Sequence, residues 1–425
     1  MTNSGHFNLR TAGFTSPKLL CPFPFLKSRT LTTTRTLEPR AFPGSGFDAI
    51  DISTKIEEET LPGYLAERYY PVQIGEVLNS RYQVLTKLGF GSASTVWLCQ
   101  DLRDHCYQVL KIHVRSQRPL PEVEILKHLS ALPQEHPGKK HVRLPLEVFE
   151  VTGPHGVHPC LLYAPSGVDI RDFMSCLEDD ALPEELLRPT IRYILLALDY
   201  LHGANIIHTD VQPNNLLVGI NDESILLEIE EDEMSNPSPR KQLPGRTIYT
   251  THGMPVTTGE PVLSDLGEAR IADSSSSQTG LIMPSVYRAP EVMLGMKWNN
   301  KVDIWAVGQM AWTLFEKGHL FQTHNLDSEV DHTKRYAEMV ALLGPPPLEF
   351  LRRSKDSLKF WDENGNWRGL AEIPTQTLES RESRLEGENK RRFLQFLRKT
   401  MQWRPEDRPT AEDLFADEWV RGDDY

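Results

Sequence analysis

The chain has 425 residues, of which 39% are hydrophobic and 25% charged, and its formal net charge at pH 7 is -13. This length exceeds what one small core holds, so we expect one large two-lobed unit or two domains. The negative charge argues against direct nucleic-acid binding or an anionic membrane surface as the main interaction, and it is compatible with a basic substrate. No apolar run approaches the roughly 18 residues that span a bilayer. The five scattered cysteines, without a CxxC pair, argue against a disulfide framework or a zinc site.

The N-terminal segment has a composition of its own. Residues 1–37 contain no acidic side chain, five basic ones and many hydroxyl groups, which is typical of a mitochondrial transit peptide. Three prolines disfavour a continuous amphipathic helix there, so a disordered tail over residues 1–60 is the alternative. Residues 61–81 are expected to form an extended lead-in.

From Tyr82 onward the sequence predicts strands first and helices afterwards. The strand segments are rich in β-branched and aromatic residues and cover 82–89, 95–100, 107–114, 146–151 and 160–164. Helical spacing starts at 122–132 and dominates after Gly167, over 184–202, 301–318, 334–344, 388–401 and 410–420. This order predicts an α+β fold with a strand-rich lobe, a helical lobe and a cleft between them.

One segment interrupts the helical part. Residues 222–260 hold an acidic cluster within 228–233 and then four prolines. We expect a surface insertion that is disordered in part.

A glycine-rich loop, 88-LGFGSASTVW-97, is the first candidate binding element. Gly89 and Gly91 let the backbone lie close over phosphate oxygens, where a Cβ would collide, and Ser94 is a small substitute for a third glycine. A strand is predicted after the loop, which disfavours a Rossmann site; an ordinary glycine-rich hairpin turn is the alternative. The residues expected beside a nucleotide here are Leu88, Gly89, Phe90, Gly91, Ser92, Ser94 and Val96.

Lys111 lies between apolar neighbours on the next strand but one, where burial without an anionic partner is costly. We expect it to hold the α- and β-phosphates of ATP. Glu122 is the expected orienting partner because the apolar positions of its helix place it at the inward edge, and Glu124 is the second candidate. A lysine that extends from a strand end to solvent is the alternative.

The segments 206-IIHTDVQPNNLLV-218 and 262-VLSDLGEAR-270 carry the chemistry. Asp210 and Asn215, five positions apart, have the spacing of a catalytic base and a metal-binding amide. Asp265 is the second expected Mg²⁺ ligand. His208 is expected to fix the loop. The order of these motifs along the chain carries more weight than any one of them.

Together the motifs resemble a eukaryotic-type protein kinase over roughly residues 72–420. The segments 287-YRAPEV-292, 303-DIWAVG-308 and 404-RPEDRPTAEDL-414 extend the resemblance. The run 69–98, with HTD at 208–210 and DLG at 265–267, is similar to the SR-protein kinases of the CMGC group, which also carry an insertion before the DLG.

The resemblance implies a kinase domain over 82–421, with an N-lobe at about 82–166 and a C-lobe at about 167–421. It implies ATP and Mg²⁺ as cofactors and a hinge at 162–167, with Tyr163 and Ala164 beside the adenine. It also implies that Glu291 pairs with Arg408 and that Asp303 holds the backbone of the catalytic loop.

Three positions depart from the resembled family. Thr209 replaces the arginine that receives an activation-loop phosphate in many kinases, which implies an enzyme that is on by default. Gln212 replaces the lysine near the γ-phosphate; it donates a hydrogen bond without a charge, so we expect a slower or differently tuned enzyme. Ser285 replaces an arginine, which leaves the preference for arginine/serine repeats open.

The leading hypothesis is a non-specific serine/threonine protein kinase that acts as a monomer on SR-type splicing factors or other basic proteins. The cytoplasm and nucleus are the expected location, with the mitochondrion as the alternative. Gln212 motivates a second hypothesis, an ATP-binding pseudokinase scaffold. A small-molecule phosphotransferase, such as a choline or aminoglycoside kinase, would share the aspartates but lack the YRAPE and DIW segments.

Overall fold

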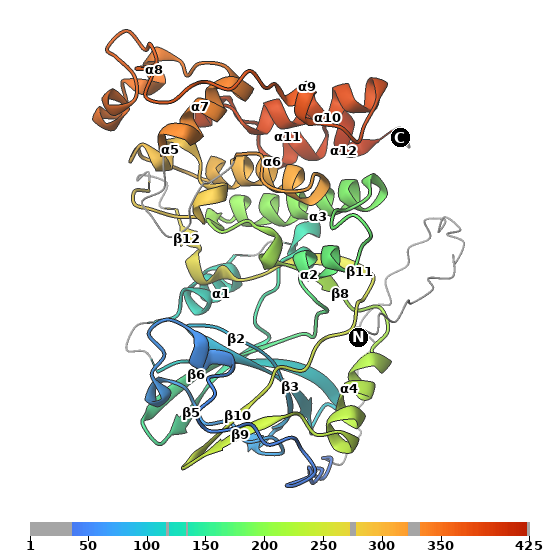
Figure 1. Ribbon diagram of the computed structural model, residues 1–425. Helices are drawn as coiled ribbons and strands as arrows, with labels where there is room; N and C mark the ends of the chain where they lie inside the picture. The colour runs from blue at the N-terminus through green and yellow to red at the C-terminus, as the bar shows by residue number, and fades with distance from the viewer. Residues whose placement is uncertain (1–35, 116–118, 133–134, 273–277, 322–331, 423–425) are drawn as a thin grey trace, which may run out of the picture.

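The computed structural model describes residues 36–115, 119–132, 135–272, 278–321 and 332–422. Its elements form a lobe built on a sheet and a lobe built of helices, one above the other in Figure 1. The predicted α+β, two-lobed arrangement is therefore confirmed.

The first lobe is an antiparallel sheet in the order β1-β2-β3-β4-β6-β5. Its strands are β1 (Val77–Leu78), β2 (Tyr82–Phe90), β3 (Ser94–Asp101), β4 (Cys106–His113), β5 (Glu147–Gly153) and β6 (Gly156–Tyr163). Because side chains alternate across a strand, Trp97, Leu110 and Leu162 pack together on one face, while Val109 and Tyr163 pack on the other. Helix α1 (Pro121–Ser130) packs on that second face. Every second side chain of β4, beginning with Val109, therefore points toward this helix.

The second lobe is organised around two helices, α3 (Glu184–Gly203) and α6 (Lys301–Phe315). Nearly every side chain of α6 is buried, because helices pack on it from several sides. The remaining helices are α2 (Ile170–Ser175), α5 (Pro290–Met293), α7 (His332–Leu343), α8 (Leu348–Leu351), α9 (Leu378–Arg381), α10 (Gly387–Thr400), α11 (Ala411–Phe415) and α12 (Glu418–Arg421). Within the described ranges, none of the helices combines the length and apolarity needed to cross a bilayer.

Two small antiparallel ladders pack on the core of the helical lobe and flank the predicted catalytic segments. One pairs β7 (Ile206–Ile207) with β12 (Arg270–Ile271), and the other pairs β8 (Leu216–Gly219) with β11 (Gly259–Leu263). The 208–215 and 264–269 segments are therefore held side by side at both ends.

The predicted partial disorder of residues 222–260 is wrong. Helix α4 (Ser224–Ser235) packs Leu226 and Ile229 against Leu85 and Leu98 of the sheet, and β9 (Arg240–Leu243) and β10 (Arg246–Tyr249) form a hairpin on the same lobe (Figure 1).

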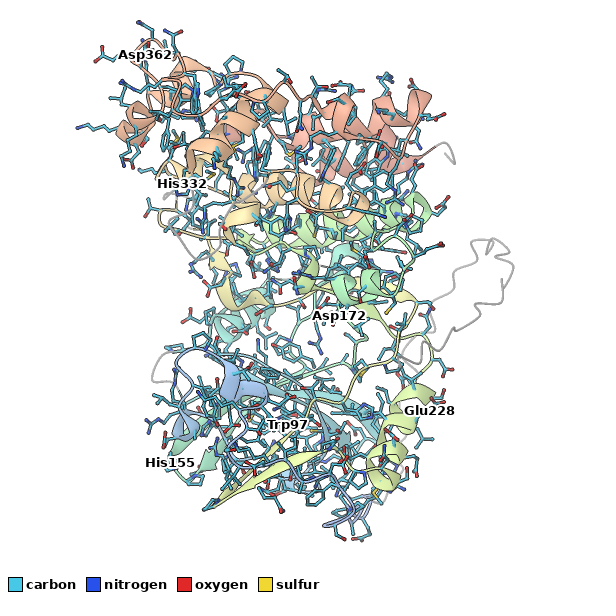
Figure 2. All side chains as sticks on the ribbon, viewed as in Figure 1. Trp97, His155, Asp172, Glu228, His332 and Asp362 are labelled. Atoms are coloured by element: carbon cyan, nitrogen blue, oxygen red, sulfur yellow. The ribbon has the colours of Figure 1, made fainter. Side chains whose placement is uncertain are left out.

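The acidic cluster of α4 misled the prediction because its residues have two different environments. Glu230 accepts a 2.6 Å hydrogen bond from Tyr107, and Glu233 accepts one of 2.9 Å from Thr86, so both carboxylates are buried with partners. Glu228 instead lies on the exposed side of α4, away from the sheet (Figure 2). The acidic composition therefore reflects buried, hydrogen-bonded carboxylates on one face of this helix and an exposed carboxylate on the other.

The N-terminal segment is also better ordered than expected. The prediction of a disordered tail up to residue 60 is wrong for residues 36–60, because Glu58 lies 2.5 Å from Lys87 Nζ and Glu59 lies 2.9 Å from Lys241 Nζ. Residues 61–81 are extended only in part: they include a short 3-10 helix, Ala66–Arg68, the strand β1, and turns at 62–63, 74–75 and 79–81. Residues 1–35, which make up almost all of the predicted transit peptide, lie outside the described residues.

Candidate active site

The catalytic loop is anchored to the core of the helical lobe by one buried carboxylate. Asp303, on α6, accepts hydrogen bonds from the backbone N–H groups of His208 (2.9 Å) and Thr209 (2.8 Å). It is fully buried, and each of its oxygens takes a different N–H group. A buried carboxylate is retained only with such partners, so the loop and the helix fix each other. This is the role that the resemblance implied for Asp303.

The imidazole of His208 is buried and links the catalytic loop to the segment before Asp265. Its Nδ1 accepts a 3.2 Å hydrogen bond from the backbone N–H of Asp210, and its Nε2 lies 3.1 Å from the carbonyl oxygen of Ser264. Thr209 adopts a left-handed backbone, with φ of 65°, and its hydroxyl donates to the carbonyl oxygen of Glu268 at 2.7 Å. The residue that replaces the usual arginine therefore ties the catalytic loop to the DLG segment without a charge.

The carboxylate of Asp210 is surrounded by amide donors. Gln212 Nε2 lies 2.9 Å from each of its oxygens, and Asn215 Nδ2 lies 2.6 Å from Oδ2. Burial raises the pKa of Asp210, while the Gln212 and Asn215 hydrogen bonds act in the opposite direction. The expected contact of Gln212 was with a phosphate, and the structure shows instead that its amide orients the predicted base.

Asp265 is the most exposed of the expected site carboxylates, with 49% of its side chain accessible. Its backbone is left-handed, with φ of 63°, and its side chain accepts a 3.2 Å hydrogen bond from the Gly267 N–H. Lys111 Nζ lies 3.6 Å from Oδ1. Burial alone would raise the pKa of Asp265. The Lys111 ammonium and the hydrogen bond from the Gly267 N–H act in the opposite direction and outweigh burial, so the pKa of Asp265 is lowered.

Lys111 joins the two lobes. Its Nζ donates to Glu122 Oε1 at 2.9 Å, and the two carboxylates around it raise its pKa despite burial. Glu122 is buried whereas Glu124 is exposed, so the structure distinguishes the two candidates in favour of Glu122. Sequence reasoning missed His113, which lies two residues after Lys111 on the same face of β4, with Nε2 3.9 Å from Glu122 Oε1. Burial lowers the pKa of His113 to about 4, so it is neutral beside this pair at pH 7.

The glycine-rich loop forms the turn between β2 and β3. Gly91 N–H donates to the Ser94 carbonyl at 2.8 Å, and the Tyr69 hydroxyl donates to the Gly91 carbonyl at 3.0 Å. A Cβ at Gly89 or Gly91 would meet no protein atom within 4 Å, so packing within the chain does not require either glycine. Leu88 and Val96 pack with Val109 and Tyr163 on the face toward the cleft, and the Phe90 and Ser92 side chains are exposed.

The hinge follows β6. Tyr163 ends this strand, and Gly167 N–H donates to the Val218 carbonyl at 2.8 Å, where the chain enters the helical lobe. Burial raises the pKa of Tyr163 to about 12. Beside it lies Arg143, which sequence reasoning missed; its Nη2 donates to the Ala164 carbonyl at 3.2 Å. A cation within the otherwise largely apolar segment 142–146 was the available signal.

A cavity of about 300 Å³ opens next to the predicted base. Its lining combines acidic and apolar groups: Asp210, Gln212, Glu268, Leu281, Ile282, Met283, Pro284 and Arg288. The Arg288 guanidinium donates to the Ile282 and Met283 carbonyls at 3.0 and 2.9 Å, so the loop uses this cation internally. The predicted pair of Glu291 with Arg408 is present and fully buried, with contacts of 2.7 and 2.8 Å.

The described geometry joins a lysine–glutamate pair, a glycine-rich loop and a hinge on one side of the cleft to two aspartates and an asparagine on the other. The protein kinase domain family matches residues 82–420. The chain belongs to this family.

The relatives place it more narrowly. A serine/threonine protein kinase of Aspergillus fumigatus is 46% identical over 388 residues, which cover 90% of this chain and 95% of the relative. The serine/threonine-protein kinase SRPK of Physarum polycephalum is 30% identical over 392 residues, 84% of this chain and 90% of the relative. Human SRSF protein kinase 3 is 32% identical over 204 residues, 46% of this chain and 35% of the relative.

A crystal structure of a kinase domain shows the same fold. It aligns with a TM-score of 0.63 at 21% identity and covers 83% of this chain and 99% of the solved chain. The predicted kinase fold, the resemblance to SR-protein kinases and the assignment as a serine/threonine protein kinase are thus confirmed, and nothing in the comparisons favours the pseudokinase alternative.

Proposed function

We propose that the chain transfers the γ-phosphoryl group of ATP to serine or threonine hydroxyls of protein substrates, as a non-specific serine/threonine protein kinase. The observation that carries this proposal is the position of Lys111. It lies 2.9 Å from Glu122 of the sheet-rich lobe and 3.6 Å from Asp265 of the DLG segment, so the groups of both lobes already converge on one place in the cleft.

Each expected site residue has a chemical role in this proposal. Asp210 orients the substrate hydroxyl and accepts its proton, with Gln212 and Asn215 fixing its carboxylate. Lys111 and the glycine-rich loop hold the phosphates, which supply the transferable group and most of the negative charge at the site.

Asn215 and Asp265 fit Mg²⁺. This cation prefers oxygen ligands, and it usually takes one or two carboxylates and completes its shell with phosphates and water.

Because Gln212 stands where related kinases have a lysine, we propose that the enzyme is slow. The Gln212 amide contacts Asp210 and brings no charge toward the phosphates, so part of the usual transition-state stabilisation is absent. The base, the metal-binding groups and the phosphate-binding lysine are all retained, so the loss affects rate.

For the substrate we propose basic proteins, including SR-type splicing factors. The supporting features are the net charge of -13, the acidic side chains of Asp210 and Glu268 at the cavity, and the relatives named SRPK and SRSF protein kinase. The chain would act as a monomer in the cytoplasm and nucleus. A fluorescent reporter fused to residues 1–60 tests this location, since a mitochondrial signal would replace it with the alternative.

The direct test is phosphate incorporation into an arginine/serine-repeat peptide by purified protein with Mg²⁺ and ATP. The control is Asp210→Asn, which keeps the size of the side chain but cannot act as a base. We expect incorporation by the natural protein and a loss of at least a hundredfold in the variant. Equal incorporation by the two proteins would remove the proposed function.

A further inference from the structure

Arg143 lies where the two lobes meet. It stands between the short 3-10 helix Pro137–His141 and β5, and its backbone N–H donates to the Leu263 carbonyl at 2.8 Å. Leu263 precedes Asp265 by two residues, and the hinge residue Ala164 accepts the hydrogen bond from the Arg143 side chain. The residue is therefore placed between the hinge and the metal-binding segment.

The guanidinium of Arg143 is poorly satisfied. Its Cζ lies 4.7 Å from the ring centroid of Tyr163, and Nη2 makes one hydrogen bond, to Ala164 O at 3.2 Å. Nε is buried and has no hydrogen-bond acceptor among the described residues. A guanidinium carries five N–H donors. Nε is buried and one Nη2 donor bonds to Ala164, so the donors left for a ligand are those of Nη1 and the second one of Nη2.

The side chain remains charged at neutral pH. Burial lowers the pKa of Arg143 to about 10, and the nearby Tyr163 and Asp265 act in the opposite direction. A cation therefore lies beside Tyr163 and Ala164, the two residues that the kinase resemblance places next to the nucleotide base.

The two common purines present different groups to such a cation. Adenine carries a donor at position 6, an amino group, whereas guanine carries acceptors at O6 and N7 that suit an arginine fork. Because Arg143 already donates to the Ala164 carbonyl, an adenine amino group would compete with it for this acceptor. Guanine would instead accept hydrogen bonds from the donors that the protein leaves unused.

We propose that Arg143 selects the base of the phosphoryl donor and makes this cleft accept guanine nucleotides alongside adenine nucleotides. The inference rests on the proposed function only in that the cleft binds a nucleoside triphosphate. It assigns no step of phosphoryl transfer to Arg143.

The test compares dissociation constants of Mg²⁺-ATP and Mg²⁺-GTP by calorimetry for the natural protein, Arg143→Leu and Arg143→Lys. Leucine keeps much of the side-chain bulk without donors, and lysine keeps the charge without the planar fork. Arg352→Leu is the matched control, since Arg352 is exposed on the helical lobe. We expect the natural protein and the control to bind the two nucleotides within about threefold of each other. In Arg143→Leu the ratio should shift toward ATP by roughly tenfold, as expected for loss of one bidentate arginine–guanine contact, with Arg143→Lys between.

Two results would overturn the inference. One is an unchanged ATP-to-GTP ratio in Arg143→Leu. The other is equal tightening of both nucleotides in that variant, because the arginine would then be a steric plug with no base preference. Binding is measured without phosphoryl transfer, so an inactive but nucleotide-binding protein would refute the proposed function and still allow this test.

Discussion

The two sides of the cleft are held in place by different means. The catalytic loop sits on the core of the helical lobe, where the fully buried Asp303 accepts two of its backbone N–H groups. The glycine-rich loop belongs to a sheet whose apolar clusters are smaller than the core of the helical lobe.

Parts of the chain far away in sequence brace that sheet. Glu58 from the N-terminal segment pairs with the buried Lys87 of β2, and Glu233 from α4 accepts a hydrogen bond from Thr86 of the same strand. Tyr69 contacts the glycine-rich loop itself through the Gly91 carbonyl. We conclude that one side of the site depends on the common kinase core, and the other on the N-terminal segment and the insertion.

The largest expected effect comes from the core side. Asp303→Ala leaves two buried backbone N–H groups without acceptors, and each such group costs about 1–3 kcal/mol. We expect the free energy of unfolding in urea to fall by about 2–6 kcal/mol and phosphoryl transfer to be lost. A variant that melts and transfers phosphate like the natural protein would show that the loop does not depend on this carboxylate.

Removal of the lysine's partner should separate activity from stability. Glu122→Gln keeps the shape of the side chain and removes its negative charge, so Asp265 remains as the carboxylate beside Lys111. We expect kcat/KM for ATP to fall by about 10- to 100-fold, equivalent to about 1.4–2.7 kcal/mol of transition-state stabilisation. The melting temperature is the control measurement. Glu124→Gln, at an exposed position of the same helix, should leave both quantities unchanged.

The bracing of the sheet gives the next effect. Lys87 is 1% exposed, and it keeps its contacts with Glu57 and the Tyr249 carbonyl when Glu58 is replaced. Glu58→Gln should therefore lower the free energy of unfolding by about 1–3 kcal/mol, which is less than the loss expected when a buried charge is left without any partner. Thermal or urea unfolding measures it. An unchanged free energy of unfolding would contradict the conclusion that the Glu58 contact of the N-terminal segment stabilises the sheet.

Gln212 gives a prediction about pH. The pKa of Asp210 is raised by burial, so the base is deprotonated, and activity appears, only above the ordinary aspartate value of about 3.9. The Gln212 amide stabilises the charged form, so Gln212→Leu should move the acidic limb of the kcat profile to higher pH. The contribution of Asp210 to folding stability changes with pH in the direction opposite to that of a salt-bridged aspartate, whose pKa is lowered. A raised pKa favours folding at low pH, and this contribution is lost as the pH rises through the folded-state value. An unmoved acidic limb would exclude Gln212 from the role of orienting the base.

The smallest effect is expected for Tyr69→Phe, which removes a single hydrogen bond to the glycine-rich loop. One such bond contributes about 0.5–1.5 kcal/mol, so KM for ATP should rise by several-fold while KM for the peptide stays constant. Tyr64→Phe in the same segment is the control, since its hydroxyl bonds to Arg246 and not to the loop. Parallel changes in both Michaelis constants would point to a general loss of structure.

Fixed spacing along the chain defines most of the predicted site. Lys111, Asp210, Asn215 and Asp265 each belong to a short motif; in the structure Lys111 Nζ lies 3.6 Å from Asp265 Oδ1 and Asn215 Nδ2 lies 2.6 Å from Asp210 Oδ2, and their roles stay predictions. The choice of Glu122 over Glu124 also followed from helical periodicity, because one face of α1 must pack on the sheet.

The prediction failed where contacts between distant segments decide the structure. The composition of residues 222–260 predicts a partly disordered insertion, yet Glu230 and Glu233 lie near the same side of α4 as Leu226 and Ile229 and accept hydrogen bonds from hydroxyl groups of the sheet. The sequence did not indicate a role for Arg143, because its side chain contacts the hinge residue Ala164, 21 positions later in the chain. Composition and periodicity describe one segment at a time and carry no information about such pairs.

The central claim is that Lys111 and Asp265 meet at one nucleotide with its metal. The most direct measurement is calorimetric binding of ATP with and without Mg²⁺ to the natural protein and to Asp265→Asn. We predict that Mg²⁺ strengthens ATP binding to the natural protein and that the variant loses most of this enhancement. An equal Mg²⁺ effect in both proteins would contradict the account.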